Sequence, residues 1–452
     1  MLFLTLATAA LALLAAWRPA HALAVIAAFG PLGGALSALA HTPATWTIPL
    51  LIATFVGASC GRVVRGEISM DRRLAGLALC WTLVVATSLV IFVAGQAPRG
   101  LRLERLADVA VWALHDFPGY DPFRVPGIWA AELATGGVGI YLLVADRCRR
   151  EPALARRLTR MLLVSAGAAG SLSAGRLAEA FLEHRPYIGN PTRPDLVLRM
   201  SVVFPDVNAA GALFLMMLPV AVWALTEKAT RTLGAVTLTC VVAGLWLASS
   251  RTTLVLVPFT LLAFVALRAC RGAARPRRAT AFAMSALPVV GGLLLVALHP
   301  RTGALGGTIR ALEIRREMAL VAARMVRADP VLGVGIGQFQ TRSTEFMSPL
   351  VRSWYASENA HNQFLQVAGE LGLPGLALFA ALVFLGVAPA LGRAVTGEMT
   401  PELAARLAGL CGFIAAALTM HPLLIPEVAL TFWIMLGVTR SAIIPAPSVG
   451  SS

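Results

Sequence analysis

Two kinds of side chain suited to proton transfer and phosphate binding occur together in residues 299–371. This stretch holds eight arginines and His361, which lies in the run Glu358-Asn-Ala-His361-Asn362. An imidazole has an unperturbed pKa of about 6.5, so it can accept a proton at neutral pH. Guanidinium groups bind phosphate oxygens through paired hydrogen bonds. Such residues suit general-base catalysis on a substrate that carries phosphate.

Motifs for nucleotide and metal chemistry are absent from the sequence. It contains no Walker loop, no GxGxxG run that opens a helix, no HExxH and no DxD pair. These motifs bind nucleotide phosphates or supply the ligands of a catalytic metal. We therefore expect no metal, no cofactor and no nucleotide-sugar chemistry.

The composition indicates the scaffold that must position these residues. Hydrophobic residues make up 58% of the 452 residues and charged residues 13%, against about 45–50% and about 25% in soluble domains. The mean hydropathy is +0.76. The net charge of +15 comes from basic residues in short loops rather than on one soluble face, which excludes a nucleic-acid-binding protein. We expect an all-α, polytopic transmembrane bundle.

Apolar runs long enough to cross a hydrocarbon core of about 30 Å recur along the chain. The expected spans number about 12–13: 2–17, 21–40, 46–61, 74–96, 126–145, 158–174, 207–225, 232–249, 253–268, 279–298, 372–391, 404–420 and 427–444. The first run has no charged start and is followed at once by another apolar run, which favours a span over a signal peptide. The expected organisation is a bundle over 1–298, one large loop with short helices over 299–371, and further spans over 372–452.

Arginine-rich loops predict the orientation of the bundle. Loops 62–73, 147–160 and 268–278 carry four, six and five arginines and are separated by even numbers of spans. We expect all three in the cytoplasm. The opposite, periplasmic side then receives the loops 98–125, 175–206, the turn near Arg251, 299–371 and the turn at 421–427.

The large loop contains a predicted helix over 309–328, which Asp329-Pro330 ends because the residue before proline disfavours the helix. On this helix Leu312, Leu320 and Val326 are available for packing. Its arginines suit either a functional site or docking on anionic lipid.

Four short sequence motifs lie between residues 199 and 380. They are the run Glu358–Leu365 followed by Glu370-Leu-Gly372-Leu-Pro-Gly375, the run Asp329–Phe339, Ser249-Ser250-Arg251, and the run Pro205–Gly211. In their order along the chain and in their spacing, these motifs resemble those of the bacterial O-antigen ligase and O-antigen polymerase superfamily. Its members are multi-span inner-membrane proteins with one large periplasmic loop. The first 198 residues resemble that family only as a pattern of spans.

The resemblance implies a role for each candidate residue. His361 is the expected catalytic base. Arg251 and Arg199, together with Arg315 or Arg316, are expected to bind a diphosphate. Neighbouring residues on a helix point about 100° apart, so at most one of Arg315 and Arg316 should face the site. Arg251 has an alternative role, in which its side chain extends from the end of a span to the membrane surface.

Other polar residues of the outer side are expected to support the site or the fold. Glu358, Asn362 and Glu370 are the supporting candidates, and Glu370 either orients His361 or caps a helix that begins near Gly372. His184 and His421 are interpreted as structural. Tight turns are the expected role of Gly333, Gly335, Gly337, Gly372 and Gly375.

The resemblance implies inverting, metal-independent transfer of a glycan from an undecaprenyl-diphosphate carrier to an acceptor sugar hydroxyl, at the periplasmic face of the inner membrane. The first interpretation is an O-antigen ligase with lipid A-core as acceptor. The alternatives are a polymerase that joins lipid-linked repeats and, from another class, a polysaccharide or lipid-linked-sugar transporter. The expected partners are the lipid-linked donor, the acceptor and membrane lipids.

Overall fold

The computed structural model describes residues 2–40, 45–66, 71–96, 127–182, 204, 206–248, 250–272, 306–353 and 357–442. Within these ranges the chain is helical and contains no strand. The helices are α1 (Leu2–Trp17), α2 (Pro19–Phe29), α3 (Gly33–Leu39), α4 (Thr47–Val64), α5 (Arg72–Gln96), α7 (Gly127–Arg150), α8 (Pro152–Leu182), α9 (Val207–Thr226), α10 (Arg231–Ala248), α11 (Arg251–Ala269), α14 (Gly306–Ala328), α15 (Phe339–Phe346), α16 (Pro349–Arg352), α17 (Gln363–Thr396), α18 (Pro401–Ala417) and α19 (Pro426–Arg440). Short 3-10 turns lie at Gly30–Leu32, Lys228–Thr230 and Pro422–Leu424.

The prediction of an all-α membrane bundle is confirmed. Eight helical segments of the described residues are long and apolar enough to cross a membrane. The predicted spans 2–17, 158–174, 404–420 and 427–444 also fall on helices, namely α1, α8, α18 and α19. The predicted span 279–298 lies outside the described residues.

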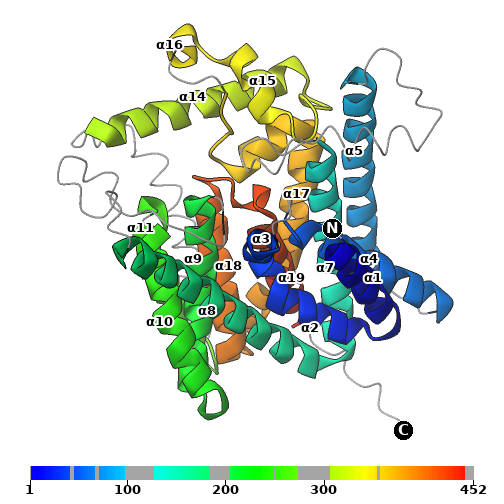
Figure 1. Cartoon of the computed structure of the whole chain (residues 1–452), viewed down its shortest axis with the longest axis vertical. Coiled ribbons are helices and arrows are strands. Elements are labelled where there is room, and N and C mark those ends of the chain that lie inside the picture. Colours follow the sequence, from blue (N-terminus) through cyan, green and yellow to red (C-terminus); the bar gives the residue numbers. More distant parts are fainter. Residues whose placement is uncertain are drawn as a thin grey trace.

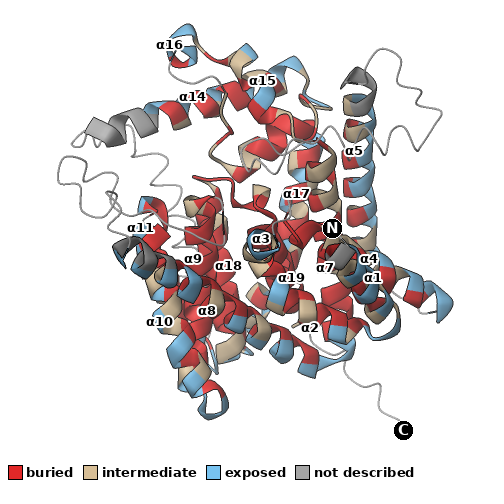
Figure 2. Cartoon of the chain, in the orientation of Figure 1, coloured by how far each residue is buried: buried red, intermediate tan, exposed pale blue. Residues whose placement is uncertain are grey.

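The centre of the bundle consists of α9, α18 and α19, whose residues are almost all buried (Figure 2). Helix α9 packs against α10 and α18, and α19 packs against α7 and α17. Helices α5 and α10 lie at the periphery and expose large apolar side chains, among them Leu79, Leu83 and Trp246. Such an apolar surface suits a lipid environment rather than water.

Small residues allow the N-terminal helices to approach closely. A Cβ atom at Gly57 or Gly61 of α4 would lie 2.1 Å from the carbonyl oxygen of Ala12 or Ala16 of α1, respectively. This spacing of two glycines four residues apart is a common device for packing membrane helices, because the backbones can touch. The contact fixes α1 against α4.

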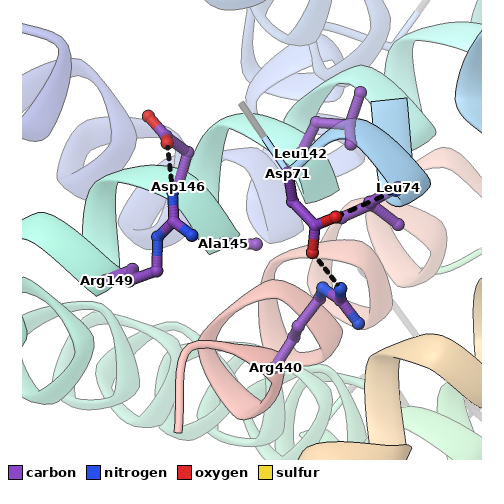
Figure 3. Close-up of a pocket in the computed structure, with 7 residues that line it drawn as sticks. All are labelled: Asp71, Leu74, Leu142, Ala145, Asp146, Arg149 and Arg440. Atoms are coloured by element: carbon purple, nitrogen blue, oxygen red, sulfur yellow. Dashed lines mark hydrogen bonds and ion pairs between the residues drawn. The ribbon is translucent and has the colours of Figure 1, made fainter. Parts of the chain in front are cut away.

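Ion pairs gather at one end of the bundle. Asp146 of α7 pairs with Arg62 of α4 at 3.0 Å and with Arg150 at 3.1 Å. Figure 3 shows the small pocket beside them, where Arg440 at the end of α19 pairs with Asp71 before α5. Residues from the two arginine-rich loops 62–73 and 147–160 therefore meet at one end, as their common orientation requires.

Helices α14, α15 and α16 lie across the opposite end of the bundle (Figure 1). They have a hydrophobic cluster of their own, to which Ile314, Met318, Val321 and Met325 of α14 contribute. The predicted helix 309–328 is therefore present, and these four residues form the face that packs inside the cluster. Leu320 is 43% exposed, because it lies on the other side of the helix from the residues spaced by three or four positions.

Candidate active site

The N-terminus of α17 carries the run that contains His361. Asn362 is the N-cap of this helix, and its Oδ1 accepts hydrogen bonds from the backbone N–H groups of Phe364 (2.9 Å) and Leu365 (3.0 Å). Its Nδ2 donates to the carbonyl oxygen of Leu418 at 2.8 Å. Such a cap satisfies backbone donors that have no partner inside the helix. Asn362 thus fixes the start of α17 and connects it to the end of α18.

His361 has an uncommon backbone conformation next to this cap. Its φ of 49° is the only positive value among the described non-glycine residues. A non-glycine residue held in this region is strained by about 1–3 kcal/mol, and such strain is concentrated at functional sites. The side chain stays 23% exposed, and its Nε2 lies 3.7 Å from Oε1 of Glu358.

Two hydrogen bonds position Glu358, one from its backbone N–H and one to its carboxylate. Its own N–H donates to Oγ of Ser343 of α15 at 3.0 Å, and its Oε1 accepts from the N–H of Asn359 at 3.0 Å. Burial and the charge of Asp206 raise the pKa of Glu358 above its usual range. The carboxyl group is thus close enough to His361 to stabilise an imidazolium ion there.

A second histidine lies beside the first. The ring centroids of His361 and His421 are 5.4 Å apart, and Nε2 of His421 is 3.9 Å from Oδ2 of Asp206. Asp206 is the N-cap of α9 and accepts from the N–H of Asn208 at 2.7 Å. Both Asp206 and His421 are buried. The cluster thus combines α17, the turn between α18 and α19, and the start of α9.

The surroundings of His361 favour its neutral form. Burial lowers the pKa of His361 well below 6.5, and the neighbouring His421 and Arg315 lower it further. A neutral imidazole has a free nitrogen lone pair at pH 7 and is ready to accept a proton. Burial also lowers the pKa of His421, while Asp206 opposes this change and Arg315 adds to it.

The structure distinguishes between the two neighbouring arginines of α14. Arg315 is half-buried, and its charge acts on both histidines of the cluster. Arg316 is exposed. Arg324 interacts within the layer formed by α14, α15 and α16, called the loop layer below. It donates hydrogen bonds to Glu317 at 2.9 Å and to the carbonyl oxygen of Phe346. Of the two neighbours, Arg315 is therefore the one whose charge reaches the cluster.

Arg251 begins α11 at the same end of the bundle and is exposed. A Cβ atom at Gly211, one turn into α9, would lie 3.1 Å from Cβ of Ser250 and 2.8 Å from Oγ1 of Thr253. The start of α11 therefore packs beside the start of α9, which carries Asp206. Arg199 and His184 lie outside the described residues.

Glu370 has a role that differs from both of those expected. Its Oε1 accepts from Nε2 of Gln366 at 2.8 Å and from the N–H of Phe339 at 3.3 Å. Within the described residues these two hydrogen bonds thus run to α17 and to the start of α15, and neither runs to His361. Glu370 therefore contacts the loop layer rather than His361.

Gly333 and Gly372 allow the backbone before α15 to contact the backbone of α17. Gly333 and Gly372 both have a φ of 65°. A Cβ atom at Gly333 would lie 2.5 Å from the carbonyl oxygen of Gly369, and one at Gly372 would lie 2.6 Å from the carbonyl carbon of Val331. Backbone N–H groups of Val334 and Gly335 donate across this contact at 2.8 and 3.0 Å. The positive φ values agree with the tight turns expected of these glycines.

Four residues of the site and its support received no site role from the sequence: Gln366, Asn359, Asp206 and His421, of which His421 was interpreted as structural. Gln366 joins the two runs, because its Oε1 accepts from the N–H of Ala360 (2.9 Å) and its Nε2 donates to Oδ1 of Asn359 (3.1 Å). The available signal was position, since Asn359 lies inside the run Glu358–Leu365 and Gln366 directly follows it. Asp206 and His421 are distant from His361 in sequence, and only the fold brings them to it. Within the described part of the chain, no three His, Cys, Asp or Glu residues are grouped as metal ligands.

Part of the chain matches a known protein family. Residues 214–380 match the O-antigen ligase family model. The matched region begins in α9 and ends in α17, so it contains Arg251, Arg315, Glu358 and His361. A search of curated proteins finds no match. The match confirms the resemblance to the O-antigen ligase superfamily.

Proposed function

We propose that this chain, which carries an O-antigen ligase domain at residues 214–380, transfers a glycan from an undecaprenyl-diphosphate carrier to an acceptor sugar hydroxyl. The reaction takes place at the periplasmic face of the inner membrane. The observation that carries the proposal is His361, which is partly exposed, lies next to a carboxyl group at the strained start of α17, and has a pKa that burial lowers.

The proposed reaction is a single displacement. His361 accepts the proton of the acceptor hydroxyl while the hydroxyl oxygen attacks the anomeric carbon. A bond from this oxygen to the anomeric carbon forms as the bond from that carbon to the carrier diphosphate breaks. The anomeric centre is inverted, and the proton stays on His361, where Glu358 stabilises the positive charge.

Arginines are proposed to bind the departing diphosphate. The negative charge on the phosphate oxygens grows as the bond breaks, and fixed guanidinium groups stabilise it. Arg315 is supported by its interaction with the histidine cluster. Arg251 is supported by its position at the start of α11, beside α9. Arg199 is proposed from the resemblance alone.

The carrier chain needs an apolar path from the lipid. Helices α4, α5 and α7 enclose a mainly apolar groove of about 670 Å³. On α7 its lining runs from Glu132 to Leu143, a rise of about 16 Å at 1.5 Å per residue. Trp81 of α5 donates to the carbonyl oxygen of Ala134 at 3.1 Å beside this groove, and Trp81 also lines a small cavity with Gln363 of α17. We propose that part of the prenyl chain lies in the groove.

Ligase and polymerase remain separate proposals with different acceptors. We propose a ligase that acts on lipid A-core, with polymerisation of lipid-linked repeats as the alternative. Because the family match indicates glycan transfer, it favours both over a transporter.

The glycans of a deletion strain separate these proposals. Loss of a ligase leaves long polymer on the undecaprenyl carrier and none on lipid A-core. Loss of a polymerase leaves single repeats attached to the core. Electrophoresis of lipopolysaccharide together with analysis of extracted carrier lipids measures the difference, and an unchanged glycan profile would overturn both proposals.

A further inference from the structure

Two segments outside the family match meet at His361. Asp206 precedes the matched residues 214–380, and His421 follows them. His421 lies in the turn between α18 and α19, directly before the 3-10 turn Pro422–Leu424. The matched region therefore does not contain the whole environment of the candidate base.

Hydrogen bonds hold this turn against the start of α17. Nδ2 of Asn362 donates to the carbonyl oxygen of Leu418 at 2.8 Å, and Oε1 of Gln363 accepts from the N–H of Leu423 at 3.0 Å. The two bonds lie on either side of His421 in the turn and come from the two residues that follow His361. They fix the distance between the two imidazole rings.

The environment of His421 is unfavourable for a residue that serves stability alone. The residue is 6% exposed, and its Nδ1 is buried with no hydrogen-bond partner among the described residues. A buried polar atom without a partner destabilises a fold by about 1–3 kcal/mol. Its other ring nitrogen is directed at the buried Asp206 carboxylate, at 3.9 Å. Conditions of this kind are typical of functional sites.

We infer that His421, which lies beside Asp206, is a positioning residue that fixes the ring of His361 and disfavours a proton on it, so that the ring can accept the proton of the acceptor hydroxyl. This inference rests on the proposed function, because it assigns His361 as the base. His421 itself is too buried to contact a substrate, so it acts through His361.

The charged groups around His361 and His421 determine whether His421 raises or lowers the pKa of His361. His361 is faced by Glu358, His421 and Arg315, and His421 is faced by Asp206, Arg315 and His361. A proton on His421 is stabilised by Asp206 and disfavours a second proton on His361. The two histidines therefore titrate as a coupled pair. Removal of His421 should raise the pKa of His361, since His421 lowers it.

A histidine titration of the full-length protein in lipid nanodiscs tests this inference without a substrate. The ¹³C-labelled imidazole signals are followed by NMR, and His361→Asn identifies the His361 signal. His421→Phe keeps a ring against His361 but removes the imidazole, and the midpoint of His361 should move to higher pH. His21→Phe, which replaces an exposed histidine on α2, should leave that midpoint in place.

A second variant provides a test if His421→Phe does not fold. Asp206→Asn preserves an N-cap side chain for α9 but removes the negative charge, so the midpoint of His421 should move to lower pH. Unchanged midpoints in whichever variants fold would overturn the inference. That outcome leaves the proposed function standing if His361→Asn abolishes transfer, whereas an active His361→Asn overturns the proposed function itself.

Discussion

His361 combines the properties that a general base requires. Burial and two neighbouring groups lower its pKa and so favour its neutral form, and Glu358 is 3.7 Å from one ring nitrogen. The sequence predicted His361, Glu358 and Asn362 because they lie in one short run. It could not predict that Asp206 and His421 belong to the same cluster, because their contact depends on how α9 and α18 pack.

The neighbouring arginines of α14 provide a matched pair for a test. Arg315→Ala should reduce kcat/KM for transfer from the lipid-linked donor by about 10- to 100-fold, because hydrogen bonds to a charged group contribute about 1.5–3 kcal/mol. Arg316→Ala should stay within about twofold of the wild-type protein, since it replaces an exposed residue. Steady-state kinetics on both purified variants measure the difference. Equal losses in the two variants would contradict the assignment of Arg315.

At the scale of elements, the kink of α17 joins the site to the bundle. The helix begins at Gln363, and Gly372 interrupts it with non-helical backbone angles. Hydropathy predicted the span from about residue 372, because the preceding turns carry Gln363, Gln366 and Glu370. These polar residues are buried in α17, where they bond the loop layer and the turn before α19. Periodicity alone cannot predict such a buried polar segment.

Alanine substitutions at two glycines of α17 distinguish the contribution of the kink to stability from the effect of helix propensity. Gly372→Ala should lower the free energy of unfolding by more than about 1–2 kcal/mol, because alanine is strained at this positive φ and its Cβ would lie 2.6 Å from the backbone of Val331. Gly392→Ala has open space and should be neutral or stabilise the helix by up to about 1 kcal/mol. Thermal unfolding in detergent compares them. A Gly372→Ala variant as stable as Gly392→Ala would show that the kink is dispensable.

At the scale of the whole molecule, the bundle has two chemically distinct ends. One end contains the ion pairs of Arg62, Asp146, Asp71 and Arg440, and the other contains the histidine cluster beneath α14–α16. The arrangement of arginine-rich loops predicted this separation, because loops joined by an even number of spans share a side. Leu320 of α14 is exposed, so its packing at the membrane surface stays a prediction.

The most direct test of the proposed mechanism is transfer by the purified His361→Asn protein. Asparagine tolerates the positive φ at this position but cannot act as a base at neutral pH. The assay uses undecaprenyl-diphosphate-linked glycan and lipid A-core extracted from the host strain, and thermal unfolding serves as the control for folding. The expected result is a folded variant whose transfer rate is about 10²–10⁴-fold lower. A folded His361→Asn protein that transfers the glycan at the wild-type rate would contradict the central claim.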